Sequence, residues 1–268
     1  MKPVASLTID KYPRTQHIRG SRLQPGDEDL EAVPFSRIAG RHIVVEEKVD
    51  GANVGIRFST AGELLLQSRG HYLSGGPREK HFTLFKQWAT TLQGALADRL
   101  GHRHVLYGEW LYAKHTVFYD RLPHYLMEFD VLDTTAGMFL DTPRRAALLA
   151  GLPLPAVRVL FSGTLRRLED LTALVGPSHF IVAGHLDRLR ADTERLGIDA
   201  ERAVRETDPS TLMEGLYIKV EEDGVVKERY KFVRADFIAA IARADGHWLE
   251  RPIVPNRLAE GVDLFAAG

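Results

Sequence analysis

A series of short β-strands joined by tight turns limits most strongly what this chain can fold into. Residues 42–49 are dense in β-branched side chains, and after the Asp50-Gly51 turn signal residues 54–58 alternate in hydrophobicity. The same reasoning predicts further strands at 64–69, 105–111, 125–132, 216–220 and 225–233. Because these strands come as hairpins and not as alternating strands and helices, the sequence predicts an α+β fold with an antiparallel sheet.

Helical periodicity occupies much of the remaining chain. Hydrophobic residues lie three or four apart over 79–100, and Gly101 is placed to end that helix. Leu, Ala and Arg recur at helical spacing throughout 142–206, which begins with Thr142-Pro143. A last amphipathic helix is predicted at 235–244. We therefore expect a single domain over residues 1–268, with a helical insertion at 142–206 and a short C-terminal helix and tail at 235–268.

Composition excludes several classes of protein. The 268 residues include 35 Lys and Arg against 36 Asp and Glu, for a net charge of −1, and no Cys. The lack of cysteine excludes disulfides and thiolate metal sites. No apolar run approaches the roughly 20 residues of a membrane helix, and the first residues lack the apolar core of a secretory signal. We expect a cytoplasmic protein with no membrane partner, in which any phosphate-binding surface is local.

The segment with the most chemical content reads Glu46-Glu47-Lys48-Val49-Asp50-Gly51-Ala52-Asn53. Strand alternation puts Glu46 and Lys48 on one face of the strand, with Glu47 on the other. A lysine at a strand end, beside a glycine turn that lets a ligand come close, can serve as a nucleophile. Taken alone, the pattern is more typical of a solvated lysine in a hairpin.

Five later segments change that interpretation, because they follow it in a recognisable order. They are Ser68-Arg69-Gly70, Tyr107-Gly108-Glu109-Trp110, Glu128-Phe129-Asp130-Val131, Glu214-Gly215-Leu216-Tyr217-Ile218-Lys219 and Arg229-Tyr230-Lys231. The series resembles the covalent nucleotidyltransferase superfamily of polynucleotide ligases and mRNA capping enzymes. Within that superfamily, Lys-Val-Asp-Gly-Ala-Asn and the opening Lys-Tyr-Pro-Arg-Thr-Gln-His of residues 11–17 are most similar to RNA ligases.

The resemblance implies an antiparallel-sheet nucleotidyltransferase (ATP-grasp-like ligase) domain and an ATP-dependent RNA ligase activity. In that reaction the lysine attacks the α-phosphate of ATP to form a lysyl-AMP, and the AMP then passes to an RNA 5′-phosphate. An RNA 3′-OH finally displaces the AMP and seals the strand. ATP is the implied AMP donor, Mg²⁺ or Mn²⁺ the implied metal, and RNA ends the implied partners, with a role in RNA repair beside a separate end-healing kinase or phosphatase.

The resemblance also implies residue roles by motif position. Lys48 is the expected nucleophile, Asn53 would assist at the strand ends, and Arg69 would contact phosphate or ribose. Glu109 would contact the ribose and, together with Glu214, the metal. The residues expected at the adenine are Phe129, stacking on the base with Asp130 beside it, and either Glu46 or Glu47, of which strand parity favours Glu46. The residues expected to hold the α-phosphate are Lys219, Arg229 and Lys231.

Two physical requirements accompany these roles. Only the neutral amine attacks, and about one lysine in 2,500 is neutral at pH 7 when the pKa is ordinary. Nearby cations would lower that pKa whereas Glu46 would raise it, and the sequence leaves the balance open. A three-residue turn over 222–224 would align Arg229 and Lys231 with Lys219, whereas a two-residue turn would not. Glu214 can reach the same pocket only if the chain kinks near Gly215.

The pattern departs from the wider superfamily in one respect and leaves alternatives open. Many relatives attach an OB-fold to the catalytic domain, but 268 − 231 = 37 residues after Lys231 are too few for one, so no OB-fold is expected. The rivals to an RNA ligase are a DNA ligase, a GTP-using capping enzyme and a nucleotide- or RNA-binding module without catalysis. The sequence does not distinguish among a nick, a single strand and a tRNA-like break as substrate.

Overall fold

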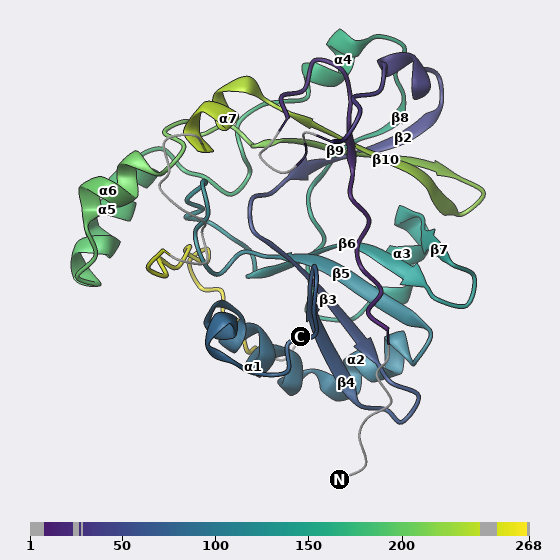
Figure 1. Ribbon diagram of the computed structural model, residues 1–268, viewed down its shortest axis with the longest axis horizontal. Helices are drawn as coiled ribbons and strands as arrows, with labels where there is room; N and C mark the ends of the chain where they lie inside the picture. Colours follow the sequence, from purple (N-terminus) through teal and green to yellow (C-terminus); the bar gives the residue numbers. More distant parts are fainter. Residues whose placement is uncertain (1–7, 24–26, 28, 242–250, 267–268) are drawn as a thin grey trace.

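A computed structural model describes residues 8–23, 27, 29–241 and 251–266. Its strands form one sheet in the order β4-β3-β5-β6-β7-β10-β9-β2-β8, and β1 pairs with β10 (Figure 1). The strand bounds are β1 Gln16–His17, β2 His42–Lys48, β3 Ala52–Phe58, β4 Leu64–Ser68, β5 His104–Trp110, β6 Leu126–Asp133, β7 Met138–Leu140, β8 Val159–Thr164, β9 Gly215–Glu222 and β10 Val225–Val233. The mixed α+β fold and the antiparallel pairing of neighbouring strands confirm the predicted fold class.

The helices lie mainly around the edges of the sheet. Their bounds are η1 Phe35–Arg37, η2 Pro77–Phe82, α1 Thr83–Thr91, α2 Gln93–Leu100, α3 Thr142–Leu149, α4 Leu168–Thr172, α5 His185–Arg195, α6 Ala200–Arg205 and α7 Ala235–Ile241. Of the helix predicted at 235–244, residues 242–244 lie outside the described residues. Within the described part of the chain, no helix is both long and apolar enough to span a bilayer.

The sheet diverges into two halves that a very short strand connects. β7 pairs with β6 through Leu132–Phe139 and with β10 through Phe139–Val226. In Figure 1 the half with β3, β4, β5 and β6 lies below, and the half with β2, β8, β9 and β10 lies above. The chain crosses between the halves at the turn between β2 and β3, which carries the Lys48 motif; these two strands pair with different neighbours, so the hairpin that the sequence suggested here is wrong.

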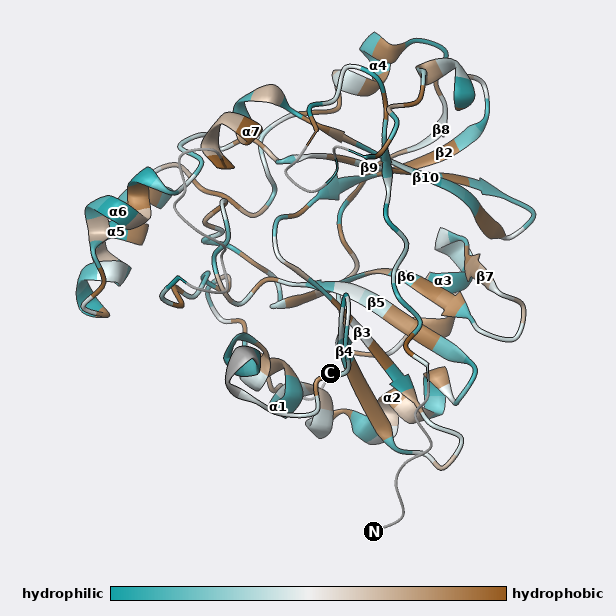
Figure 2. Cartoon of the chain, viewed as in Figure 1, coloured by the Kyte–Doolittle hydropathy of each residue, from teal (hydrophilic) through white to brown (hydrophobic). Residues whose placement is uncertain are grey.

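The lower half is held by a hydrophobic core between the sheet and the helix pair α1–α2. Val54, Ile56 and Leu106 from the sheet pack with Phe85 and Trp88 from α1. Figure 2 shows hydrophobic residues along β3 and β4 opposite these helices, whereas α5 and α6 at the molecular edge are largely hydrophilic. The predicted helical region over 79–100 and its end at Gly101, which has a positive φ of 51°, are confirmed, but the single predicted helix is wrong, because the segment consists of η2, α1 and α2 and breaks at Leu92.

The prediction of helix throughout 142–206 is wrong for Val159–Thr164. This segment forms β8, an edge strand that pairs antiparallel with β2, for example His42 with Thr164 and Ile43 with Gly163. The residues Val159, Phe161 and Thr164 favour an extended backbone, and β2 offers an unpaired edge for them. The rest of the segment contains the short helices α3 to α6.

The β9–β10 hairpin reaches the predicted alignment by a different route. Glu222 pairs with Val225, so the turn contains two residues, Asp223 and Gly224, both with positive φ, and the predicted three-residue turn is wrong. The register then shifts between Val226 and Glu228, which inserts one extra residue into β10. This bulge restores the alignment, because Arg229 stands opposite Lys219 and Lys231 opposite Tyr217. The chain also bends at Glu214, which confirms the predicted kink.

The N-terminal segment runs from one half of the sheet to the other. The backbone oxygen of Asp10 accepts hydrogen bonds from Gln67 Nε2 and Tyr107 Oη, both in the lower half. Six residues later, β1 pairs parallel with β10 in the upper half. In Figure 1 this segment, in dark purple, passes between the halves, so it closes one side of the space between them.

We predict that Gly215→Ala destabilises the protein by about 1–3 kcal/mol, because overpacking a central strand forces its neighbour to move. A Cβ at this position would lie 2.0 Å from the backbone oxygen of Phe232 in β10. Urea unfolding followed by circular dichroism measures the change. The matched control is Gly94→Ala in α2, where a Cβ meets nothing within 4 Å and the helix should gain about 0.5–1 kcal/mol. Equal stability of both variants would contradict the prediction.

Candidate active site

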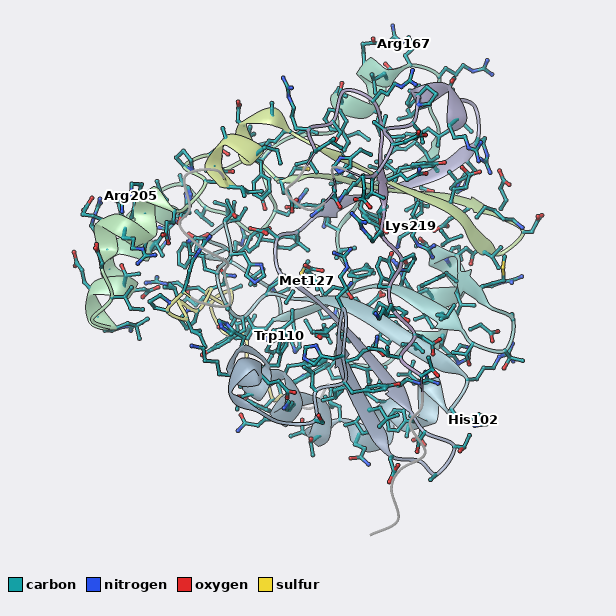
Figure 3. All side chains as sticks on the ribbon, in the orientation of Figure 1. His102, Trp110, Met127, Arg167, Arg205 and Lys219 are labelled. Carbon is teal, nitrogen blue, oxygen red and sulfur yellow. The ribbon has the colours of Figure 1, made fainter. Side chains whose placement is uncertain are left out.

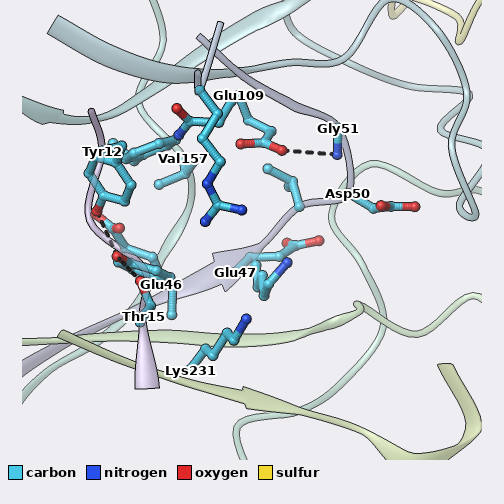
Figure 4. A pocket seen from close by; sticks show the side chains of 15 residues that line it. Tyr12, Thr15, Glu46, Glu47, Asp50, Gly51, Glu109, Val157 and Lys231 are labelled. Carbon is cyan, nitrogen blue, oxygen red and sulfur yellow. Dashed lines mark hydrogen bonds between the residues drawn. The ribbon is translucent and has the colours of Figure 1, made fainter. Parts of the chain in front are cut away.

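A pocket of about 250 Å³ lies where the two halves of the sheet diverge. Figure 4 shows side chains from both halves and from the N-terminal segment pointing into it. Its lining residues are Tyr12, Thr15, Glu46, Glu47, Lys48, Val49, Asp50, Gly51, Asn53, Arg69, Glu109, Phe129, Val157, Tyr217 and Lys231. The pocket therefore brings together seven of the residues that the sequence analysis singled out, namely Glu46, Lys48, Asn53, Arg69, Glu109, Phe129 and Lys231.

Lys48 is the last residue of β2, and its side chain is 20% exposed. Its Nζ lies 2.6 Å from Oε1 of Glu214, which is fully buried beside the pocket. Burial favours the neutral amine, but the charges of Glu214, Glu109 and Asp50 outweigh burial and raise the pKa of Lys48. The balance that the sequence left open is thus decided by carboxylates, and the lysine is held protonated.

The turn after Lys48 is fixed by hydrogen bonds from residues that no sequence motif indicated. The carboxylate of Asp50 accepts bonds from the backbone amides of Thr116 and Val117, at 2.7 and 2.8 Å. The Asp50 amide donates to Tyr119 Oη at 2.8 Å. These contacts anchor the turn to residues 116–119, so the end of β2 and the lysine on it have a defined position.

Glu109 and Glu214 are two acids whose pKa values are raised even though Lys48 lies close to them. Burial raises the pKa of Glu109 to about 8 and that of Glu214 to about 7, although Lys48 lowers both. The Glu109 carboxylate accepts one hydrogen bond from the Gly51 amide at 3.1 Å. Across the described residues, no group of three or more His, Asp or Glu side chains forms a ready-made metal cluster. A cation here would have these two carboxylates as its protein ligands.

The predicted phosphate-binding residues fall into two groups. Lys231 lines the pocket and pairs with Asp27, and burial together with the charge of Lys48 lowers its pKa. Arg69 also lines the pocket, in the exposed segment after β4. Lys219 and Arg229 do not line it, because both side chains bind carboxylates in the layer beneath.

That layer is a buried ion network. Lys219 Nζ lies 2.9 Å from Glu46 and 3.2 Å from Asp130, and it also donates to the backbone oxygen of Phe129. Arg229 lies 2.9 Å from Asp130. Arg145, at the first turns of α3, lies 3.0 Å from Glu46 and 3.2 Å from Glu128. Figure 3 places the labelled Lys219 between the two halves of the sheet. Arg145 carried no motif signal and was not predicted.

The charges in the network decide which acids are ionised. Burial raises the pKa of Asp130, but Lys219, Arg229 and Arg145 outweigh it and lower the pKa to about 2. Glu128 has weaker compensation, and burial raises its pKa to about 6. The Asp130 carboxylate therefore stays charged at neutral pH and holds the cations of β9 and β10 in place.

Aromatic side chains of Tyr12, Phe129 and Tyr217 form another part of the pocket lining. Phe129 packs edge-on against Tyr12 with ring centroids 5.1 Å apart. Tyr12 Oη donates to Asp130 at 2.5 Å and lies 2.6 Å from Tyr217 Oη. This arrangement offers a flat apolar surface beside fixed hydroxyl groups. The sequence pointed to Phe129, whereas Tyr12 was noted only as part of the opening segment.

Both acids before Lys48 line the pocket, and both carboxylates have protein partners. Glu46 binds Arg145 and Lys219, on the same face of β2 as Lys48. Glu47 accepts hydrogen bonds from Ser178 Oγ at 2.6 Å and pairs with His179 Nδ1 at 2.8 Å. Strand parity therefore separates the two glutamates as the sequence predicted.

Comparison with known proteins gives one family and one set of related structures. The RNA ligase family model matches residues 41–233. The fold is similar to that of Naegleria gruberi RNA ligase with PPi (TM-score 0.53, 18% identity, 86% of this chain and 57% of that chain). Variants of that ligase give similar values, one with ATP and Mn (0.52, 16%, 86% and 58%) and one with AMP and Mn (0.51, 16%, 88% and 59%). No curated protein matches the chain in sequence.

These structural matches show a shared fold at low sequence identity. The chain spans less than three fifths of the length of the N. gruberi structures that it matches. The matched family segment contains the turn after Lys48 and ends at the last residue of β10.

We predict that Glu109→Gln stabilises the ligand-free protein by about 1–3 kcal/mol at pH 8, with a smaller gain at pH 5. The folded pKa is raised from about 4.5 to about 8, so ionisation destabilises the fold as pH rises through that window. Because the Glu109 side chain is partly exposed, solvent screening makes the stability gain smaller than the whole pKa change would give. Urea unfolding at both pH values measures it.

The exposed Glu260→Gln is the control and should change stability by less than about 0.5 kcal/mol at either pH. A stability gain for Glu109→Gln that is the same at pH 5 and pH 8 would show that the buried charge is not its cause.

Proposed function

Because the chain belongs to the RNA ligase family, we propose that it is an ATP-dependent RNA ligase that works through a lysyl-AMP on Lys48. The single observation that carries the proposal is the position of Lys48. Lys48 lines a pocket together with Phe129, the acid Glu109 and the cations Arg69 and Lys231, and its Nζ pairs with the buried Glu214 beside that pocket. The N. gruberi ligase structures of similar fold contain ATP or AMP with Mn, which supports ATP and a divalent metal as the requirements of this chain.

The first step would be attack of the Lys48 amine on the α-phosphorus of ATP. A nitrogen–phosphorus bond forms, the bond from phosphorus to the bridging oxygen breaks, and pyrophosphate leaves. The amine must first lose its proton, and Glu214 Oε1, 2.6 Å away, is within reach to accept it. The raised pKa of Glu214, about 7, makes it a better proton acceptor than an ordinary carboxylate.

Positive charge is needed where negative charge develops on the phosphate. Lys231 and Arg69 line the pocket and would supply it directly. Lys219 and Arg229 would contribute indirectly, because they fix Asp130 and the backbone of Phe129. The nucleotide base would stack on Phe129 beside Tyr12, with Glu46 on the same strand face as Lys48.

Glu109 and Glu214 have the donor chemistry for Mg²⁺ or Mn²⁺. Mg²⁺ is commonly held by one or two carboxylates together with phosphate oxygens and waters. Burial raises the pKa of both acids, so a cation would relieve an existing penalty. When bound, it would supply charge neutralisation at the phosphates.

The later steps would use the same pocket. The adenylyl group would pass from Lys48 to the 5′-phosphate of an RNA strand, and a 3′-OH would displace AMP as the strand is sealed. Asn53 stands opposite Glu109 in the β3–β5 register and lines the pocket where the strand end would come. Because only 5′-phosphate and 3′-OH ends react, breaks with other ends would need a separate kinase or phosphatase first, which fits a role in RNA repair.

We predict that purified protein incubated with labelled ATP and Mg²⁺ acquires a covalent adenylyl group on Lys48. Label should come from ATP and not from GTP, and mass spectrometry of peptides should locate it. Lys48→Ala and Lys48→Arg should both reduce labelling by about 10³-fold or more, because a guanidinium does not supply a neutral amine.

Three results would separate the alternatives. Label from GTP alone would favour a capping-type enzyme, and ATP binding without an adduct would favour a non-catalytic binding module. Sealing of DNA strands in preference to RNA strands by the adenylylated protein would favour a DNA ligase. Lys227→Arg, in the exposed part of β10, is the matched lysine control and should keep full labelling.

A further inference from the structure

A second concavity lies on the other side of the wall that carries Glu47 and Val157. Both residues line the nucleotide pocket (Figure 4). The second groove is lined instead by Ala156 and Arg158, which flank Val157 in the chain. Ser178 and His179, which bind the Glu47 carboxylate, also line it. It has a volume of about 580 Å³, and its lining residues are Arg121, Pro123, Ala156, Arg158, Ser178, His179, Phe180, Ile181 and Ala259.

The charged side chains that line this groove are all basic. It is lined by Arg121, Arg158 and His179 and by no Asp or Glu. Both arginines are exposed, and neither guanidinium has an ion pair or side-chain hydrogen bond with any residue in the described part of the chain. Nearby arginines differ, since Arg188 pairs with Asp120 and Arg257 with Asp192. The groove thus keeps two positive charges uncompensated in a protein whose net charge is −1.

The backbone that carries these arginines is held firmly. The amides of Asp120 and Arg121 both donate to the backbone oxygen of Phe180. The Asp120 carboxylate also binds the Val182 amide at 2.8 Å. The backbone oxygen of Arg158 accepts a hydrogen bond from the Glu47 amide at 2.8 Å. The two guanidinium groups that line the groove therefore extend from backbone positions fixed by hydrogen bonds.

We propose that this groove binds the phosphodiester backbone of the RNA strand whose end reacts at Lys48, an inference that rests on the proposed ligase function. Guanidinium groups bind phosphate oxygens through paired hydrogen bonds. Pro123, Phe180 and Ile181 supply apolar walls without competing acids. Contacts of this kind are independent of base sequence. A strand in the groove lies one residue's thickness from the nucleotide pocket, because Val157 separates them.

The test is binding of a short, fluorescently labelled, 5′-phosphorylated RNA strand to the full chain, measured by anisotropy without ATP. The double variant Arg121→Gln/Arg158→Gln should raise the Kd at least tenfold. The slope of log K against log salt should become shallower by about 1.4, since each phosphate contact on a single strand contributes about 0.7. The matched control is Arg166→Gln/Arg167→Gln, which removes the same charge from exposed positions between β8 and α4.

The control should change the Kd by less than threefold, and all proteins should have the same melting temperature to within a few degrees. RNA affinity that is unchanged in the groove variant, or reduced equally in both variants, would overturn the proposal. Binding of a polyglutamate peptide without binding of RNA would assign the groove to an acidic protein partner and would also overturn it.

The adenylylation assay on the wild-type protein keeps the two proposals apart, because it contains no RNA. An adduct on Lys48 with no effect of the groove variant on RNA binding would reject the groove and keep the ligase. A groove-dependent RNA affinity without any adduct would keep the RNA-binding groove and reject the ligase chemistry.

Discussion

The site depends on one buried ammonium group, that of Lys219, which joins the two halves of the sheet. It binds Glu46 on β2 and Asp130 on β6 and donates to the backbone of Phe129. Within the strand order, the halves are joined by the three residues of β7, and residues 155–158 add backbone hydrogen bonds to Glu128 of β6 and Glu47 of β2. Buried charges are tolerated only when paired with good geometry, so these partners must assemble together. The aromatic wall of the pocket is thereby fixed relative to the strand that carries Lys48.

The need to pair buried charges also explains why the pKa values differ between the ion network and the pocket. In the network beneath it, cations compensate Asp130, and its pKa falls to about 2. At the pocket, Glu109 and Glu214 share mainly Lys48, and burial raises their pKa values to about 8 and 7. A folded protein accepts such a penalty where function needs it. The raised pKa values of the two acids beside Lys48 distinguish the pocket from the structural ion pairs beneath it.

Glu47 and Val157 form the wall between the pocket at Lys48 and the groove lined by Arg121 and Arg158. Glu47 is anchored by Ser178 and His179, which belong to the region following β8. That region also lines the groove with the uncompensated arginines. A segment that the sequence predicted as a helical insertion therefore contributes an edge strand, hydrogen bonds to Glu47 and part of the lining of a basic groove. Its position beside β2 gives it direct contact with the strand that carries Lys48.

The sequence determined most of the strands, the helical character of 79–100 and the motif that carries Lys48, because period-two and period-3.6 patterns and ordered motifs are local properties of the chain. It also predicted that Arg229 and Lys231 would align with Lys219, but not the bulge near Lys227 that achieves it. Tertiary structure alone decided that Lys219 and Arg229 bind acids beneath the pocket, that Arg145 joins them, and that carboxylates keep Lys48 protonated. Those outcomes depend on distances between residues up to 173 positions apart in the chain, and electrostatic energy follows distance in space, which no local pattern encodes.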